Sequence, residues 1–421
     1  MDNKKMESIS PATKQLTNNY KKLTEIPRFY QKIPLNDDSL ASRVREEARA
    51  LFLQNMSKKV IENEELQQLW VLLEKSCSQT SESYDKQRID YLEFKRILTL
   101  LDPNSKAREY FTAKIFVKLQ DNHPNGKISI LNFFNYIMRK VWLRQTRIAL
   151  SLYDITGQGF LKETDLENYI QELIPTLSQL DSLDKEFHKF YICIAVRKFF
   201  FFLDPHKHNK IKIVDILCSG FLDDLLELRD EDLNKTREEA NWFSATNTLR
   251  LYSSYLRLDD DHNGMLSKAE MIKYGNLTNL FIERLFDVCI TYEKEIDFKT
   301  YIDIVLALEN RKEPQSIYFL FQILDIKNQR FMDAFCINYF FKAIQEQMRL
   351  QGQEPLSVDD VCDEIFDMVA PLEATKITFE DLITCGQADT VINILIDING
   401  FWAYENREQQ IVDTQDESAQ V

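Results

Sequence analysis

Residues 259–270 carry oxygen donors at the spacing that one bound cation requires. The donors are the side chains of Asp259, Asp261, Asn263 and Glu270 and the backbone carbonyl of Met265. Gly264 stands between them, where the chain has to turn sharply. A hard divalent cation with six to eight oxygen ligands is bound in this way, and the last glutamate supplies two of the oxygens. The stretch therefore predicts a calcium site.

The sequence around this loop recurs along the chain. Ser267 and Glu270 match an S-x-x-E helix start, and the apolar residue before them, Leu266, stands where EF-hand loops pair through a short β-ribbon. Equivalent apolar residues are Ile89, Ile128, Leu161, Ile211, Ile296, Met332 and Ile377. Such helix starts also arise by chance in helical proteins, but eight in order favour a repeat. We expect an all-α fold of two lobes built from EF-hand-like helix–loop–helix pairs, mostly degenerate, with two-residue ribbons.

The other loops lack parts of the ligand set. Loop 121–132 has histidine at its third position and ends in asparagine, and loop 204–215 has no glycine. Loop 154–165 offers only two carboxylates, which leaves a weak or magnesium-like site open. Loop 325–336 places Lys327 where a ligand belongs and ends in Cys336, so we expect no metal there. The partner of the complete loop, 289–300, has no ligand set and is expected to supply only the ribbon. His206 and His208 are interpreted as turn residues, since a transition-metal site would need further ligands.

Composition narrows the class of protein. The 421 residues carry a net charge of −15, which argues against general nucleic-acid binding and fits a cation or a basic partner. Only 9 glycines and 10 prolines are present, as is typical of long helices. The seven cysteines show no C-x-x-C pair, so we expect reduced core cysteines and a cytoplasmic or nuclear location. The apolar stretch 190–203 contains Arg197 and Lys198, so it predicts a buried helix and no membrane insertion.

Changes in composition predict four segments. They are a polar N-terminal segment (1–40), an N-terminal helical lobe with degenerate repeats (41–240), a C-terminal EF-hand lobe (241–403) and an acidic disordered tail (404–421). The polar, charged stretch 230–245 marks the predicted division between the lobes.

An acidic run beside aromatic residues is a candidate partner contact. Asp223 and Asp224 precede Trp242 and Phe243 in "FLDDLLELRDEDLNKTREEANWF" (221–243). A solvated acidic helix is the plain alternative, whereas exposed aromatics anchor many interfaces. "GFWAYENRE" (400–408) is either a second anchor or the closure of the C-terminal core.

Long stretches of the chain resemble a known family. "FFLDPHKHNKIKIVDILCSGFLDDLLELRDEDL" (201–233), "FFNYIMRKVWLRQTRIALSLYDITGQGFL" (133–161) and "DTVINILIDINGFWAYENRE" (389–408) resemble the B″ regulatory subunits of protein phosphatase 2A, the gamma type and its plant TONNEAU-type relatives among them. The resemblance covers residues 20–408. It implies a non-catalytic subunit that docks on the HEAT-repeat scaffold and the catalytic subunit and directs serine/threonine dephosphorylation of protein substrates.

The resemblance also implies the metal ligands. Longer relatives carry two calcium-type loops, and the first corresponds to 259–270, with Asp259, Asp261, Asn263, Met265 and Glu270 as Ca²⁺ ligands. The second corresponds to 325–336, where Arg330 and Cys336 break the pattern. Some relatives act at centrosomes or cortical microtubule arrays, which makes a microtubule-associated pool an expectation here.

Two other classes remain open. A free-standing calcium sensor would bind a target helix, although a single complete loop and only 9 methionines are a poor match to that class. A cytoskeletal or centrosomal adaptor would act without the phosphatase. The chain has no Walker loop, G-x-S-x-G elbow, H-E-x-x-H or kinase signature, so an enzyme is not expected.

Overall fold

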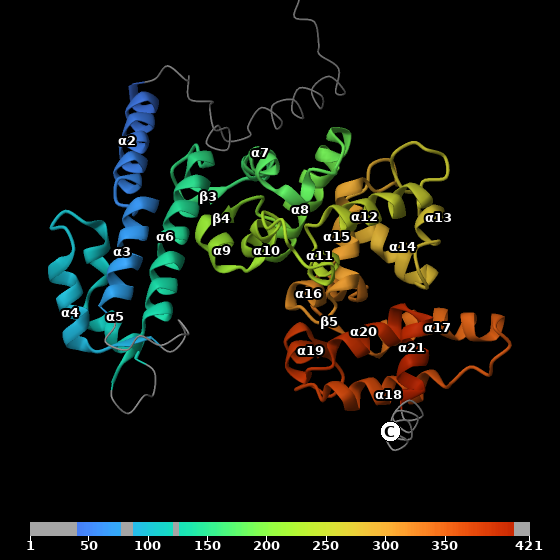
Figure 1. The fold of residues 1–421 in the computed structure, drawn as a ribbon. Coiled ribbons are helices and arrows are strands. Elements are labelled where there is room, and N and C mark those ends of the chain that lie inside the picture. Colours follow the sequence, from blue (N-terminus) through green and yellow to red (C-terminus); the bar gives the residue numbers. More distant parts are fainter. Residues whose placement is uncertain (1–39, 77–86, 121–125, 408–421) are drawn as a thin grey trace, which may run out of the picture. The chain divides into compact units, whose positions relative to one another are not determined.

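The computed structural model describes residues 40–76, 87–120 and 126–407 (Figure 1). The predicted polar segment lies outside these residues except for its last residue, and so does the predicted tail beyond residue 407. Residues 404 and 405 of the predicted tail belong to the last helix, α21 (Ile398–Glu405).

The chain divides into two compact units, residues 1–148 and 149–421. The division predicted near residue 240 does not separate these units. Phe243, next to the predicted boundary, is buried against Phe199, a residue of the predicted N-terminal lobe.

The described residues of unit 1 contain one pair of helix–loop–helix elements. Its helices and strands are α2 (Leu40–Ser57), α3 (Asn63–Lys75), β1 (Arg88–Ile89), α4 (Tyr91–Leu100), α5 (Ala113–Lys118), β2 (Ile128–Ser129) and α6 (Ile130–Tyr153), which continues into unit 2. A capping box between Asp90 and Glu93 begins α4. The buried rings of Phe94, Phe116 and Phe133 close the core of this pair.

Three further pairs lie in unit 2, within residues 149–407. Its first part comprises β3 (Phe160–Leu161), α7 (Glu163–Leu173), α8 (His188–Leu203), β4 (Ile211–Lys212), α9 (Ile213–Cys218), α10 (Phe221–Glu227), α11 (Lys235–Ala240) and α12 (Ala245–Leu258). It continues with α13 (Lys268–Met271), α14 (Asn279–Val288), α15 (Phe298–Glu309), α16 (Pro314–Leu324), β5 (Phe331–Met332), α17 (Ala334–Leu350), α18 (Val358–Val369), β6 (Ile377–Thr378), α19 (Phe379–Cys385), α20 (Ala388–Ile396) and α21.

All eight predicted ribbon residues pair in register. The antiparallel partners are Ile89 with Ile128, Leu161 with Ile211, Leu266 with Ile296, and Met332 with Ile377. Each of the eight side chains is buried. The all-α fold of EF-hand-like pairs with two-residue ribbons is therefore confirmed.

The apolar stretch 190–203 lies in α8, which is a core element as predicted. Phe199 and Phe200 belong to one hydrophobic cluster of unit 2, and Phe201 and Phe202 to the next. Among the described residues, no helix combines the length and apolar character needed to span a membrane. Of the cysteines that the structure describes, Cys289, Cys336 and Cys362 are buried and Cys218 is exposed. All of the described cysteines are free.

Candidate metal centre

The loop 259–270 is held between two helices whose ends are fixed by its own residues. Asp259 follows the last residue of α12, and a capping box between Ser267 and Glu270 begins α13. The hydroxyl of Tyr255 on α12 donates a hydrogen bond to the carbonyl of Gly264 (2.8 Å). The middle of the loop is thereby tied to the helix before it.

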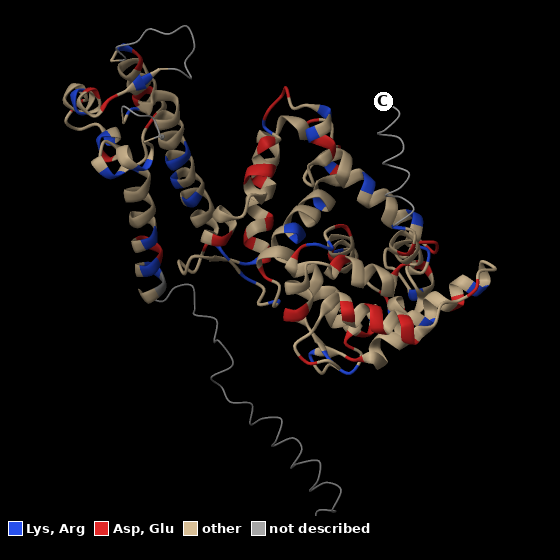
Figure 2. Ribbon diagram, turned by 90° about the horizontal axis from the view of Figure 1, so that it is seen from below, with Lys and Arg blue, Asp and Glu red and all other residues tan. Residues whose placement is uncertain are grey.

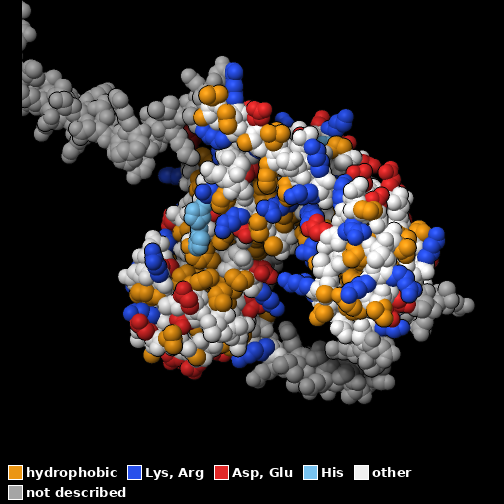
Figure 3. All heavy atoms as spheres, turned by 90° about the vertical axis from the view of Figure 1, so that its left-hand side faces the viewer, with side chains coloured by type: hydrophobic (Ala, Val, Ile, Leu, Met, Phe, Trp, Pro, Cys, Tyr) orange, Lys and Arg blue, Asp and Glu red, His pale blue; other side chains and the backbone are white. Residues whose placement is uncertain are grey.

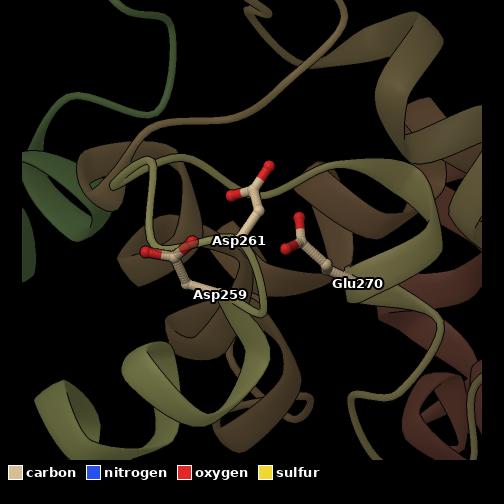
Figure 4. Close-up of side chains that lie close together, drawn as sticks. All are labelled: Asp259, Asp261 and Glu270. Carbon is tan, nitrogen blue, oxygen red and sulfur yellow. The ribbon is translucent and has the colours of Figure 1, made fainter.

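Three carboxylates of the loop converge (Figure 4). Asp259, Asp261 and Glu270 each offer an oxygen, and these oxygens lie within 4.8 Å of one another. Asp259 and Glu270 are buried, with 2% and 6% of their surface exposed, whereas Asp261 is open to solvent. One side of the cluster is thus built into the protein and the other is accessible to an incoming cation.

The backbone of the loop turns through two left-handed residues. His262 has φ 58° and Gly264 has φ 81°. A β-carbon is disfavoured in this region, so glycine at the sixth loop position removes strain, as the sequence indicated. The turn aims the N–H groups of Asn263 and Gly264 at the carboxylate of Asp259, at 3.2 and 3.0 Å.

The remaining predicted ligands lie beside this cluster. Asn263 donates its side-chain amide to Asp261 (3.1 Å), and its side-chain oxygen accepts from the N–H of Met265 (2.7 Å).

Glu295 is a residue that sequence reasoning missed. It comes from the partner hairpin, and the side-chain amide of Asn263 donates to its carboxylate (3.2 Å). The partner hairpin therefore contributes a further negative charge beside the three converging carboxylates. The signal was the ribbon register, because pairing Leu266 with Ile296 brings the residue before Ile296 to the loop.

Hydrogen bonds keep Glu270 ionised. Burial alone would raise its pKa, but the Ser267 hydroxyl and the N–H groups of Ser267 and Asp260 donate to its carboxylate, and the net effect is a lowered pKa. An all-oxygen set with several negative charges suits a hard divalent cation such as Ca²⁺.

A buried aspartate at the first loop position is not itself a sign of metal. Asp154, Asp204 and Asp325 are buried in the same way, and each accepts N–H groups of its own loop. Within the described residues, a cluster of three potential metal ligands occurs only in loop 259–270. The first residues of loop 121–132, among them His123, lie outside the described part.

Loop 325–336 carries a cation of its own. The ammonium of Lys327, at the third position, lies 2.8 Å from the carboxylate of Asp333 at the ninth. Cys336, at the last position, is buried and offers no carboxylate.

The predicted partner contact is only partly exposed. Phe243 is 1% exposed, so its predicted role as a surface anchor is wrong: it lies within the core, with its ring centre 5.7 Å from that of Phe199 on α8. Trp242 is half-buried, and the ammonium of Lys198 lies 5.1 Å from its ring centre. Asp223 and Asp224 are exposed on α10.

Of the two interpretations of residues 400–408, closure of the core holds for Phe401. Phe401 is buried beside Phe341 and closes the C-terminal core, and Trp402 is half-buried against the same cluster. Figure 2 shows acidic and basic residues distributed over many of the described helices.

The chain is similar to curated proteins over most of its length. No protein-family model matches it. It is 56% identical to the gamma-type B″ regulatory subunit of serine/threonine-protein phosphatase 2A from Danio rerio, over 94% of this chain and 86% of that protein. The Homo sapiens protein of the same name is 55% identical, over 94% of this chain and 87% of that protein. TON2 of Arabidopsis thaliana, a probable regulatory protein of the B″ type, is 37% identical, over 91% of this chain and 82% of that protein.

A solved structure shares the fold. A chain of a PP2A PR70 holoenzyme, named with the term diCa, matches with a TM-score of 0.52 and 26% identity, over 57% of this chain and 91% of that chain.

Proposed function

The chain belongs to the gamma-type B″ regulatory subunits of serine/threonine-protein phosphatase 2A, and on that premise we propose that it docks on the scaffold and catalytic subunits to direct serine/threonine dephosphorylation of protein substrates. It is a regulatory subunit and not a catalytic one. The observation that carries the proposal is the 55–56% identity to B″ gamma subunits over 94% of the chain.

Calcium is the second part of the proposal. Asp259, Asp261 and Glu270 would hold the ion, with Asn263 and the carbonyl of Met265 completing the set. The convergence of the three carboxylates and the oxygen-only chemistry support this assignment. A bound ion would offset part of the negative charge of the loop and link the end of α12 to the start of α13.

We expect one calcium site in this helix–loop–helix pair, because the hairpin that pairs with loop 259–270 has no ligand set. Residues 289–300 form a tight hairpin in which Tyr292 pairs with Glu295 through left-handed Glu293 and Lys294. Such a hairpin lacks the ligand spacing of a calcium loop, so binding would proceed without a second site in the pair. We expect a simple hyperbolic calcium titration.

The location is proposed from the family. We expect a cytoplasmic or nuclear protein with a pool at centrosomes or microtubule arrays. Fluorescence microscopy of the tagged chain together with a centrosomal marker tests this expectation.

The test is a pull-down with purified scaffold and catalytic subunits, in calcium and in chelator. Wild-type protein is compared with Glu270→Gln and with Glu346→Gln, a matched control on the exposed face of α17. Association in both conditions would indicate a constitutive role. Association that occurs only in calcium, and that is lost in Glu270→Gln but kept in Glu346→Gln, would indicate a calcium-controlled role. No association in either condition would overturn docking and favour the free-standing sensor.

A further inference from the structure

A cavity of about 390 Å³ lies in unit 1, and we call it the α5–α6 cavity. One side comes from the last residue of α5 and the two residues that follow it. The other side comes from α6, which supplies side chains at positions i, i+3, i+4 and i+7 of one helix face. No carboxylate of the described residues lines the cavity. The lining residues are Lys118, Leu119, Gln120, Asn132, Asn135, Tyr136 and Arg139.

Unit 1 is the basic part of the chain. Its described residues include 18 Lys and Arg residues and 10 Asp and Glu residues, whereas those of unit 2 include 26 and 45. Between Asp121 and Asp154 the sequence has no acidic residue, so α6 carries no carboxylate along its whole length. An uneven distribution of this kind creates a local positive potential in a protein whose net charge is −15.

The cations at the α5–α6 cavity have no acidic partner. Lys118 and Arg139 line the cavity and Lys140 follows on α6; all three are exposed, and none forms an ion pair within the described residues. Elsewhere in unit 1, Lys106 and Arg144 each form a salt bridge with a glutamate. Lys and Arg side chains also lie among hydrophobic and uncharged ones on the face drawn in Figure 3. The cavity therefore offers positive charge that the fold leaves unneutralised.

Tyr136 brings two of these cations together. The ammonium groups of Lys118 on α5 and Lys140 on α6 lie 5.6 and 5.7 Å from the centre of its ring. The electron-rich face of the ring attracts each ammonium group, but the two positive charges repel each other. An anion bound beside Tyr136 reduces this repulsion, so it gains more than the attraction of a single cation.

Uncharged donors complete the cavity. The side-chain amides of Gln120, Asn132 and Asn135 are exposed and make no hydrogen bond within the described residues. Asn132 lies in the first turn of α6, where the helix dipole favours negative charge. Amide, guanidinium and ammonium groups all donate to carboxylate oxygens, and Arg139 can do so with two parallel bonds.

We propose that the α5–α6 cavity binds an acidic segment of a partner protein, in which Asp and Glu supply the negative charge. Carboxylates of the segment pair with Arg139 and with the two lysines at Tyr136, and the amide of Asn132 donates to them. The donors of α6 from Asn132 to Arg139 extend over about 10 Å, which is the length of about three extended residues. Several consecutive acidic residues match this length better than one phosphate group does.

The charge of the whole chain favours a short segment over a nucleic acid. A nucleic acid is a long polyanion, and a chain with a net charge of −15 repels it beyond the cavity. A short acidic segment interacts mainly with cations within about 10 Å, because salt screens the more distant exposed charges. The positive charge of the cavity therefore decides its binding.

The test is fluorescence anisotropy with a fluorescein-labelled peptide, Glu-Asp-Glu-Leu-Asp-Glu, titrated with the full-length chain. Lys118→Gln and Arg139→Gln, made together, remove two charges from exposed helix positions that glutamine tolerates, so this cavity variant is expected to fold. The matched control, Arg96→Gln with Lys342→Gln, removes the same charges from exposed positions of α4 and α17 outside the cavity. We expect the cavity variant to bind about 5–30-fold more weakly than wild type, since two charge-assisted pairs are lost.

A second variant separates charge from packing. Lys118→Arg with Arg139→Lys keeps both positive charges in the cavity, and we expect it to bind the peptide within about 3-fold of wild type. Binding as weak as that of the cavity variant would show that the side-chain shapes matter and the charge does not, which contradicts the proposal.

The remaining outcomes decide the identity of the partner. Weaker binding by the cavity variant, with the control protein unchanged, supports the proposal. Equal binding by the cavity variant and wild type overturns it, as does equal binding of a peptide with serines in place of the acidic residues. Binding of only a phosphoserine peptide, or only a single-stranded oligonucleotide, also overturns it. These titrations use the chain alone, so their result does not depend on association with the scaffold and catalytic subunits.

Discussion

Loops 259–270 and 325–336 have closely similar backbones and different chemistry. Both turn through left-handed residues at their fourth and sixth positions, which are His262 and Gly264 in one loop and Asn328 and Arg330 in the other. Both begin with a buried aspartate that accepts the N–H groups of the fifth and sixth residues. Only the first loop brings three carboxylates together. The EF-hand backbone therefore holds its shape through its own hydrogen bonds and ribbon, and metal binding depends on a few side chains added to it.

The largest expected effect comes from giving loop 325–336 the calcium ligands of loop 259–270. Lys327→Asp, Arg330→Gly and Cys336→Glu, made together with Glu270→Gln, supply the missing carboxylates and remove the internal cation. We expect calcium binding with a Kd of roughly 1 mM or tighter, which corresponds to about −4 kcal/mol. Isothermal titration calorimetry measures it. The matched control carries Cys336→Gln in place of Cys336→Glu and is expected to bind far more weakly.

One result would contradict the expected gain of calcium binding. If the converted protein binds no more calcium than the Glu270→Gln protein alone, then the backbones of the two loops are not interchangeable and the neighbouring Glu295 matters more than the loop ligands.

The next test concerns the buried aspartate at the first position of each loop, Asp259 and Asp325. Asp325→Ala leaves two backbone N–H groups without an acceptor, so we expect the free energy of unfolding to fall by about 2–3 kcal/mol. Asp259→Ala in chelator is expected to cost a similar amount, with a further loss in calcium because the ligand-linked stabilisation disappears. Urea unfolding followed by tryptophan fluorescence measures both. Asp325→Asn keeps one acceptor oxygen and is expected to lose about half as much, whereas a fully stable Asp325→Ala protein would show that the ribbon alone holds the loop.

The ribbon residues, Phe243 and Glu295 show how much of the structure could be predicted from the sequence. The ribbon residues were found because each follows from a local pattern of one apolar residue before a helix start. Phe243 was misplaced because its burial depends on α8, more than forty residues earlier in the chain, and no local pattern reports that contact. Glu295 was missed because it reaches the loop from another hairpin. Local spacing thus predicts a loop, and tertiary packing decides what surrounds it.

A smaller effect concerns the sixth loop position. Arg330→Gly relieves a left-handed residue, which costs about 1–2 kcal/mol, while the flexible unfolded glycine returns roughly 0.5–1 kcal/mol of that. We expect a net stabilisation of about 0.5–1 kcal/mol in urea unfolding. Asn328→Gly is the matched control and is expected to change stability less, because asparagine tolerates this conformation. Equal effects of the two variants would show that the strain at Arg330 is not specific to its side chain.

The smallest expected effect is the change with pH in the stability that Glu270, at the last position of loop 259–270, contributes. The folded pKa of Glu270 is below its ordinary value of 4.5, although burial alone would raise it, because the hydrogen bonds from Ser267 and Asp260 favour the charged form. Its contribution to stability is therefore present above pH 4.5 and is lost as the pH falls through the folded pKa. Urea unfolding in chelator from about pH 6 to about pH 3 should show a shrinking difference in the free energy of unfolding between wild type and Glu270→Gln.

Cys336, at the equivalent position of loop 325–336, is the control. Burial raises the pKa of its thiol, so the thiol stays neutral in acid and the difference in the free energy of unfolding between wild type and Cys336→Ser should stay constant. A constant difference for both positions would mean that the hydrogen bonds at Glu270 do not distinguish the charged carboxylate from the neutral acid.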